Sequence, residues 1–192
     1  MNEHNEYHAR LNIHVSDEQI KRVLDYYNND LNNLKINDIE SYNKILYKSY
    51  YLKGLELFYL NRSILIDDSL LRFFHDGIAT KVHLCKMPAN STLEWHIHAD
   101  DNTANINIPI QDPNNSLTLF NDASNYTEVN ESRPISKVDY HLNSAALLNV
   151  KKFHAVFNMA DNVRYILMIR IQDPLTYDDV LAYCRKNNLI NN

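Results

Sequence analysis

The chain has 192 residues, 45% of them hydrophobic, and a formal net charge of -5 at pH 7. This length supports one sizeable core, so we expect a single domain over residues 1–192. The negative charge and the lack of a Lys/Arg cluster argue against nucleic acid as a partner. No run approaches the ~18 apolar residues of a membrane span. The N-terminus lacks a secretion signal, and the two cysteines lack CxxC spacing, so we expect a soluble, cytoplasmic protein with no membrane partner.

The first 77 residues are expected to be a mainly helical flank. Ser16 and Gln19 resemble a capping box, and apolar residues then recur at helical spacing, which predicts an amphipathic helix over 17–30. A second helix is expected over 38–51. Such helices would cover one face of a sheet.

Residues 78–171 have the sequence pattern of a β core. Short β-like runs are separated by Asn, Asp and Pro turns; they read IATKVHLCKM, TLEWHIHA, ANINIPI, SLTLF, KVDYHL, AALLNV, HAVFN and VRYILMIRI. This pattern favours an antiparallel sandwich or barrel. Residues 121–134 are expected to form a surface loop or lid. Thr176 and Asp179 stand in capping positions, which predicts a C-terminal helix within 172–192 and an overall α+β fold.

The segment from Trp95 to Asp100 carries a pattern suited to metal binding. If it is a strand, then His96, His98 and Asp100 project from the same face, because strand side chains alternate. Burying these polar groups without partners would cost roughly several kcal/mol, and a bound cation is the simplest way to offset that cost. Two imidazoles and one carboxylate are the ligands of non-haem Fe(II) oxygenases. A further histidine must then come from elsewhere in the chain.

His154 is the natural distal ligand, because it lies in a strand-like run followed by a tight polar turn and another strand. Arg164 falls on that next strand, where a hairpin could return it beside the metal face. A guanidinium grips a carboxylate with two parallel hydrogen bonds. Arg164 could therefore anchor the far end of a dicarboxylic co-substrate whose other end chelates the metal.

These motifs resemble the 2-oxoglutarate/Fe(II) oxygenases with a double-stranded β-helix, and within them the prolyl-hydroxylase and aspartyl/asparaginyl-hydroxylase-like branches. The matching runs, over about residues 78 to 171, are MPANSTLEWHIHADD, NINIPI, ALLNVKKFHAVFN and NVRYILMIRI. The resemblance implies a jelly-roll, cupin-like core between flanking helices. It also implies Fe(II) bound by His98, Asp100 and His154, and 2-oxoglutarate held by Arg164.

The implied activity is that of a dioxygenase that hydroxylates an organic substrate, such as a small molecule or an amino-acid or peptidyl side chain. The second residue that holds 2-oxoglutarate is not identified, and Asn107, Thr118 and Asn158 are the alternatives.

Two neighbouring residues receive other roles. His96 shares the face of His98 and could replace it, but the family pattern pairs the carboxylate with the histidine two positions before it. His96 is therefore expected outside the ligand set, as a supporting or substrate-facing residue. Arg170 has the same strand parity as Arg164 but lies about 20 Å further along, and we expect it to form a surface ion pair.

Two alternative functions stay open. His98 and His154 lie in runs that also echo cupin motifs, which suggests an isomerase or a metal-dependent dioxygenase that needs no 2-oxoglutarate. The usual cupin glutamate is missing, however, since Asn102 and Thr103 stand in its place. A non-catalytic binding or structural module with the same β core is the other alternative.

Overall fold

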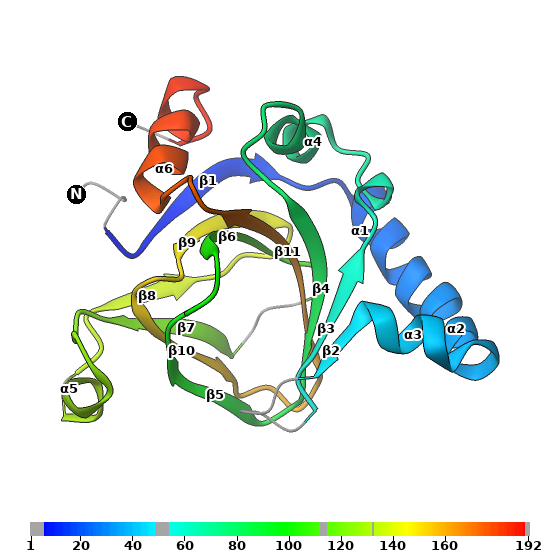
Figure 1. Cartoon of the computed structure of the whole chain (residues 1–192), viewed down its shortest axis with the longest axis horizontal. Helices are drawn as coiled ribbons and strands as arrows, with labels where there is room; N and C mark the ends of the chain where they lie inside the picture. The colour runs from blue at the N-terminus through cyan, green and yellow to red at the C-terminus, as the bar shows by residue number, and fades with distance from the viewer. Residues whose placement is uncertain (1–5, 49–53, 112–114, 132, 191–192) are drawn as a thin grey trace.

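The computed structural model describes residues 6–48, 54–111, 115–131 and 133–190. Two antiparallel sheets form its centre, and Figure 1 shows helices at one end and along one flank. The larger sheet has the order β1-β9-β6-β11-β4-β3-β2, and the smaller one has the order β5-β10-β7-β8. The larger sheet is built from β1 (His8–His14), β9 (Ser144–Asn149), β6 (Asn102–Pro109), β11 (Arg164–Gln172), β4 (Lys81–Met87), β3 (Glu56–Leu60) and β2 (Leu46–Lys48). The smaller sheet is built from β5 (Ser91–His96), β10 (Phe153–Asn158), β7 (Ser116–Asn121) and β8 (Ser136–Asp139).

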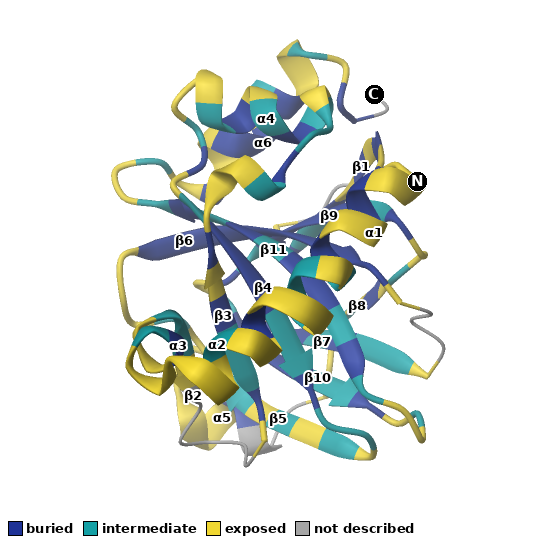
Figure 2. Cartoon of the chain, turned by 90° about the vertical axis from the view of Figure 1, so that its right-hand side faces the viewer, coloured by how far each residue is buried: buried dark blue, intermediate teal, exposed yellow. Residues whose placement is uncertain are grey.

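The helices pack mainly on the larger sheet. They are α1 (Asp17–Asp25), the π-helix η1 (Tyr26–Leu31), α2 (Asn32–Asn37), α3 (Ile39–Ile45), the 3-10 turn η2 (Arg62–Ile64), α4 (Asp68–His75), α5 (Tyr126–Glu131) and α6 (Tyr177–Lys186). Apolar side chains of α1, α4 and α6 join one core with the sheet strands, among them Val23, Phe73 and Val180. Figure 2 shows that the outer sides of α1 and α2 stay exposed. These helices therefore cover one face of the larger sheet.

Alternate side chains of β11 point to the two faces of the larger sheet. Leu167, Ile169 and Ile171 belong to the core beneath the helices. Arg164 and Arg170 belong to the opposite series and line a cavity between the two sheets. Successive side chains of a strand point to opposite faces, so the same strand supplies both the apolar core and the polar cavity wall.

Most sequence expectations for the β core are confirmed. Each of the eight strand-like runs after residue 78 contains one strand, and Thr176 with Asp179 forms a full capping box at α6. Ser16 caps α1, but the side chain of Gln19 bonds Ile64 and Ile66 instead of returning to Ser16, so the reciprocal half of that box is absent.

Three expectations need correction. The sheet is not confined to 78–171, because β1 and β3 from the first 77 residues add strands to it. The helix expected over 38–51 ends at Ile45 and gives way to β2, and residues 49–51 of it lie outside the described residues. The expected loop 121–134 contains α5. Within the described parts of the chain, no helix has the length and apolar character needed to cross a membrane.

Candidate metal centre

A cavity of about 120 Å³ lies between the two sheets. Its walls combine apolar side chains, such as Leu93, Val150 and Val156, with a concentrated set of polar ones. The polar residues that line it are His83, His96, His98, Asn105, Asn107, Thr118, His154, Arg164 and Arg170. None of its described lining residues is an Asp or a Glu. The cavity therefore carries positive charge and metal-binding imidazoles without an acidic side chain of its own.

Three histidines converge in this cavity. One ring nitrogen of each of His96, His98 and His154 lies within 4.8 Å of those of the other two. His96 is the last residue of β5 and pairs directly with His154 on β10. His98 follows two residues later, where its backbone N–H donates to Val150 O at 3.0 Å. Two adjacent strands and the segment that leaves one of them thus place three imidazoles together.

Each of the three imidazoles uses its Nδ1 atom for a local hydrogen bond. Nδ1 of His96 lies 2.7 Å from Glu94 O, and Nδ1 of His154 lies 2.9 Å from Lys152 O. Nδ1 of His98 lies 2.7 Å from the side-chain amide of Asn102. In the amide orientation in which the Asn102 nitrogen donates to Ile171 O, the Asn102 oxygen accepts a hydrogen bond from His98 Nδ1. Because Nδ1–H donates in each ring, the lone pair lies on Nε2, which is the state of a metal-ligating histidine.

The three imidazoles are neutral near pH 7. Burial, reinforced by the nearby His96, lowers the pKa of His98 to about 4. Burial holds the pKa of His154 well below its usual value of 6.5, and burial also lowers the pKa of His96. A metal ion requires unprotonated imidazole. The environment of the cluster therefore favours the metal-binding form of each ring.

Arg164 adds an unpaired cation to the same cavity. Its side chain is 5% exposed, and its Nε and Nη1 atoms have no hydrogen-bond partner among the described residues. Its guanidinium carbon lies 4.7 Å from the ring centroid of Tyr140. A buried charge without a counter-ion is costly. The orphaned guanidinium therefore fits a bound anion, as the sequence prediction requires.

Asp100 lies apart from the histidine cluster. Its Oδ2 accepts a hydrogen bond from Arg170 Nη2 at 2.5 Å, and its side chain is 53% exposed. β5 ends at His96, and Lys151 Nζ binds the carbonyl oxygens of both His98 and Asp100. The alternation expected through Asp100 therefore does not hold. The ion pair predicted for Arg170 is present, but Arg170 also lines the cavity.

The three residues considered for the second co-substrate contact lie in two different places. Asn107 and Thr118 line the cavity, and both contact the Tyr140 hydroxyl, at 3.4 and 3.1 Å. Asn158 does not line it; its amide nitrogen donates to Pro88 O at 2.7 Å and to Asn162 O at 2.9 Å. The structure thus brings Asn107 and Thr118 to the cavity with Arg164 and places Asn158 at the end of β10, outside the cavity.

An outer hollow of about 680 Å³ shares wall residues with the cavity, including His83, His96 and Arg170. Partly exposed Tyr47, Tyr59 and other apolar side chains line the outer part. The histidine cluster therefore borders both a small inner space and a larger outer one.

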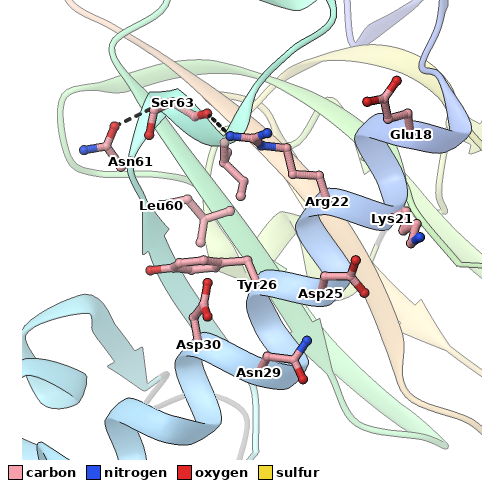
Figure 3. Close-up of a pocket in the computed structure, with 11 residues that line it drawn as sticks. Glu18, Lys21, Arg22, Asp25, Tyr26, Asn29, Asp30, Leu60, Asn61 and Ser63 are labelled. Atoms are coloured by element: carbon pink, nitrogen blue, oxygen red, sulfur yellow. Dashed lines mark hydrogen bonds between the residues drawn. The ribbon is translucent and has the colours of Figure 1, made fainter.

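Another hollow, of about 530 Å³, lies on the surface beside α1 and η1 (Figure 3). Its charged side chains have both signs, and Arg22 donates to Ser63 O at 3.1 Å. The residues that line it include no histidine or cysteine. It therefore offers no imidazole or thiolate as a metal ligand.

Comparison with known proteins identifies the fold. No protein-family model and no curated protein sequence matches the chain. Among solved structures, a non-heme monooxygenase, the ThoJ-Ni complex, is 15% identical with a TM-score of 0.60, over 86% of this chain and 73% of that one. A prolyl hydroxylase from Trichoplax adhaerens, in complex with a peptide fragment of the hypoxia inducible factor oxygen degradation domain, is 13% identical with a TM-score of 0.57, over 93% and 88%. The alpha ketoglutarate dependent epimerase SnoN from nogalamycin biosynthesis is 10% identical with a TM-score of 0.55, over 86% and 77%.

The chain has the fold of the 2-oxoglutarate/Fe(II) oxygenases. At the level of the fold, this confirms the resemblance seen in the sequence.

Sequence reasoning missed several residues of this site, and three of them belong to or contact the histidine cluster or Arg164. His96 was expected outside the ligand set, yet it lies in the cluster, and its direct pairing with His154 could not be read without the strand register. Tyr140, whose ring covers Arg164, gave no signal beyond its place in a strand-like run. Asn102, which orients His98, stood four residues after it as a visible polar neighbour.

Proposed function

We propose that this chain is a 2-oxoglutarate- and Fe(II)-dependent oxygenase, an oxidoreductase of the dioxygenase type, and that its two sheets form a double-stranded β-helix. One observation carries the proposal: a single cavity joins three imidazoles that could hold a metal to a buried arginine whose Nε and Nη1 have no hydrogen-bond partner among the described residues. Fold alone does not establish function, so the residues of the cavity carry the assignment.

The residues of the cavity divide into a metal end and an anion end. His98 and His154 would hold Fe(II) together with a third ligand, which the sequence prediction places at Asp100. That carboxylate can reach the metal only if it leaves Arg170. When bound, Fe(II) would supply the activation of O2 that couples conversion of 2-oxoglutarate to succinate and CO2 with oxidation of the substrate.

At the anion end, Arg164 would bind the distal carboxylate of 2-oxoglutarate through a charge-assisted, two-point contact. Asn107 and Thr118 line the same cavity, where an amide N–H and a hydroxyl could donate to that carboxylate. Apolar walls such as Leu148 and Val156 exclude water, which strengthens the electrostatic contacts. The same inner space thus suits a small dicarboxylate between a cation and a metal.

The outer hollow would receive the substrate. Its walls include Tyr47, Tyr59 and Ile97, which suit contacts with an apolar or aromatic group. Hydroxylation of a small molecule or a peptidyl side chain is the reaction we propose, since a prolyl hydroxylase of this fold binds a peptide. An epimerase shares the fold as well, so the product must be identified directly.

A second function is favoured by one specific observation, the ion pair that holds Asp100 away from the histidines. A metal site of three histidines would suit a cupin-type dioxygenase or isomerase that needs no 2-oxoglutarate. The unpaired charge of Arg164 has no role in that alternative, which is why we rank it second.

The test is succinate formation. The purified chain, reconstituted with Fe(II) without oxygen and then exposed to O2 and 2-oxoglutarate, should release succinate, and a true substrate should increase the rate. Arg164→Ala should remove both 2-oxoglutarate binding and succinate release. Failure of the wild-type protein to bind 2-oxoglutarate at all would refute the proposal and favour the cupin-type alternative.

A further inference from the structure

We infer that this chain binds its metal through Nε2 of His96, His98 and His154, with His96 in the position that the sequence motif gives to Asp100. The inference rests on the proposed function only for the identity of the metal. The placement of four side chains supports it: His96, His98 and His154 converge, and Asp100 is bound by Arg170.

The first observation is that the three histidine side chains converge. Among the described residues, His96, His98 and His154 are the group of His, Cys, Asp or Glu side chains close enough together to hold a metal ion. A metal–nitrogen distance of about 2.1 Å separates two ligands of one ion by at most about 4.2 Å. The ring nitrogens lie within 4.8 Å of one another, so a modest inward movement of the rings would complete the site.

The second observation is the orientation of the three imidazole rings. His96 has the same local support as His98 and His154, because an oxygen atom binds its Nδ1 and leaves Nε2 for a ligand. Such outer hydrogen bonds fix the tautomer and the direction of metal-ligating histidines. A histidine that only faced substrate would not need this match. His96 is thus prepared in the same way as the two predicted ligands.

The third observation is that other residues already bind the Asp100 carboxylate. Arg170 Nη2 binds Oδ2 of Asp100, and the backbone N–H of Asn102 donates to its Oδ1 at 3.2 Å. Arg170 Nε has no hydrogen-bond partner in the described parts of the chain, so departure of Asp100 would leave a guanidinium that is only 17% exposed without its counter-ion. The backbone of Asp100 is also held by Lys151. Moving the carboxylate to the metal would therefore break several contacts.

Three neutral ligands have an electrostatic consequence. A carboxylate would cancel part of the charge of a divalent ion, whereas three imidazoles leave all of it in the cavity. That charge adds to the field of Arg164, and bound cations are often the largest local charges in a site. The inner cavity should therefore select doubly negative ligands.

The experiment compares two variants that each remove one donor from the same segment, His96→Gln and Asp100→Asn. Calorimetric titration with Ni(II), in the absence of 2-oxoglutarate, gives the affinity of each folded variant and of the wild type. Electron paramagnetic resonance of the Cu(II)-loaded proteins counts the coordinated imidazoles. Circular dichroism and thermal unfolding confirm that the variants are folded.

The inference predicts that H96Q lowers Ni(II) affinity by more than about 100-fold, beyond the roughly 10- to 100-fold expected for loss of an outer-shell partner. It predicts that D100N changes affinity by less than about fivefold, as expected for loss of a partly exposed charge. Wild type and D100N should show three coordinated imidazoles and H96Q should show two.

A larger or equal loss in D100N, two imidazoles in the wild type, or no Ni(II) binding would overturn the inference. If H96Q does not fold, the wild-type imidazole count and the D100N titration decide the question by the same criteria. A chain that binds Ni(II) through three imidazoles but does not bind 2-oxoglutarate would support this inference and refute the proposed function, so the two failures are distinguishable.

Discussion

His96 and His154 are direct cross-strand neighbours on β5 and β10, and their ring centroids lie 4.2 Å apart. His98 completes the group, with its centroid 5.4 Å from that of His154. Protonated rings at this distance would repel one another in a buried site, so the native structure requires neutral imidazoles. The cluster therefore links the stability of the protein, its metal affinity and pH.

Acid should destabilise the metal-free protein from about pH 6.5 downward. The pKa of His98 is lowered by burial from 6.5 to about 4, so between these values the unfolded chain binds a proton that the folded chain does not. Stability therefore rises with pH through this window and is lost as the pH falls. Thermal unfolding measured between pH 4 and 7 should show a shallower slope in His98→Gln.

His83 supplies the control for that prediction. Burial lowers its pKa to about 4 as well, but it lies outside the histidine cluster. His83→Gln should therefore also flatten the dependence of stability on pH, while the loss of Ni(II) affinity in acid stays as in the wild type. An unchanged slope in both variants would contradict the assigned protonation states.

Arg164→Met should uncouple stability from 2-oxoglutarate. The buried guanidinium lacks partners on Nε and Nη1, so its removal should not lower, and should raise, the melting temperature of the free protein. Saturation with 2-oxoglutarate at 100 times Kd should stabilise the metal-loaded wild type by about 2.7 kcal/mol. R164M should lose this gain, and an equal gain in both proteins would exclude Arg164 as the anion site.

Tyr140 should support the same anion through Arg164. Its ring lies under the guanidinium, and its hydroxyl contacts Thr118 and Asn107. Tyr140→Phe keeps the ring, whereas Tyr140→Leu removes a cation–π contact worth about 0.5–2 kcal/mol. The Kd for 2-oxoglutarate should therefore rise more in Y140L than in Y140F. Equal effects would assign the role of Tyr140 to its hydroxyl alone.

Asn158→Ala should reduce stability without changing co-substrate affinity. The Asn158 side chain is 1% exposed and donates to two backbone carbonyls, those of Pro88 and Asn162. Leaving these groups unsatisfied should cost about 1–3 kcal/mol in urea unfolding. Asn107→Ala is the matched comparison, because Asn107 lines the cavity and should affect 2-oxoglutarate affinity instead.

The fold was largely predictable where local patterns decide it. Alternating runs located the eight strands after residue 78, and the Thr176 capping box located α6. β1, β2 and β3 escaped prediction because they lie in the part of the chain expected to be mainly helical and join the sheet by tertiary pairing, as in Leu148 with His8 and Leu84 with Phe58. Pairing between distant segments is a tertiary property that no short window contains.

The site was predictable in its residue types and less so in its register. His98, His154 and Arg164 were found because motif order and spacing placed them on predicted strands of one β core, and the structure brings all three to one cavity. Asp100 was placed by assuming that β5 continues, but the strand ends at His96 and Arg170 takes the carboxylate. A shift at a strand end changes which side chains share a face, and His96 rather than Asp100 therefore lies close to His98 and His154.

The most direct test of the account is an oxygen-free titration of 2-oxoglutarate into the wild-type protein with and without Fe(II), repeated with Arg164→Gln. We predict tight binding only when both Fe(II) and Arg164 are present, because the metal and the guanidinium would hold opposite ends of one molecule. Removal of the arginine should cost roughly 2–5 kcal/mol, as for a buried charge pair. Binding of equal strength without Fe(II), or in R164Q, would contradict the shared site.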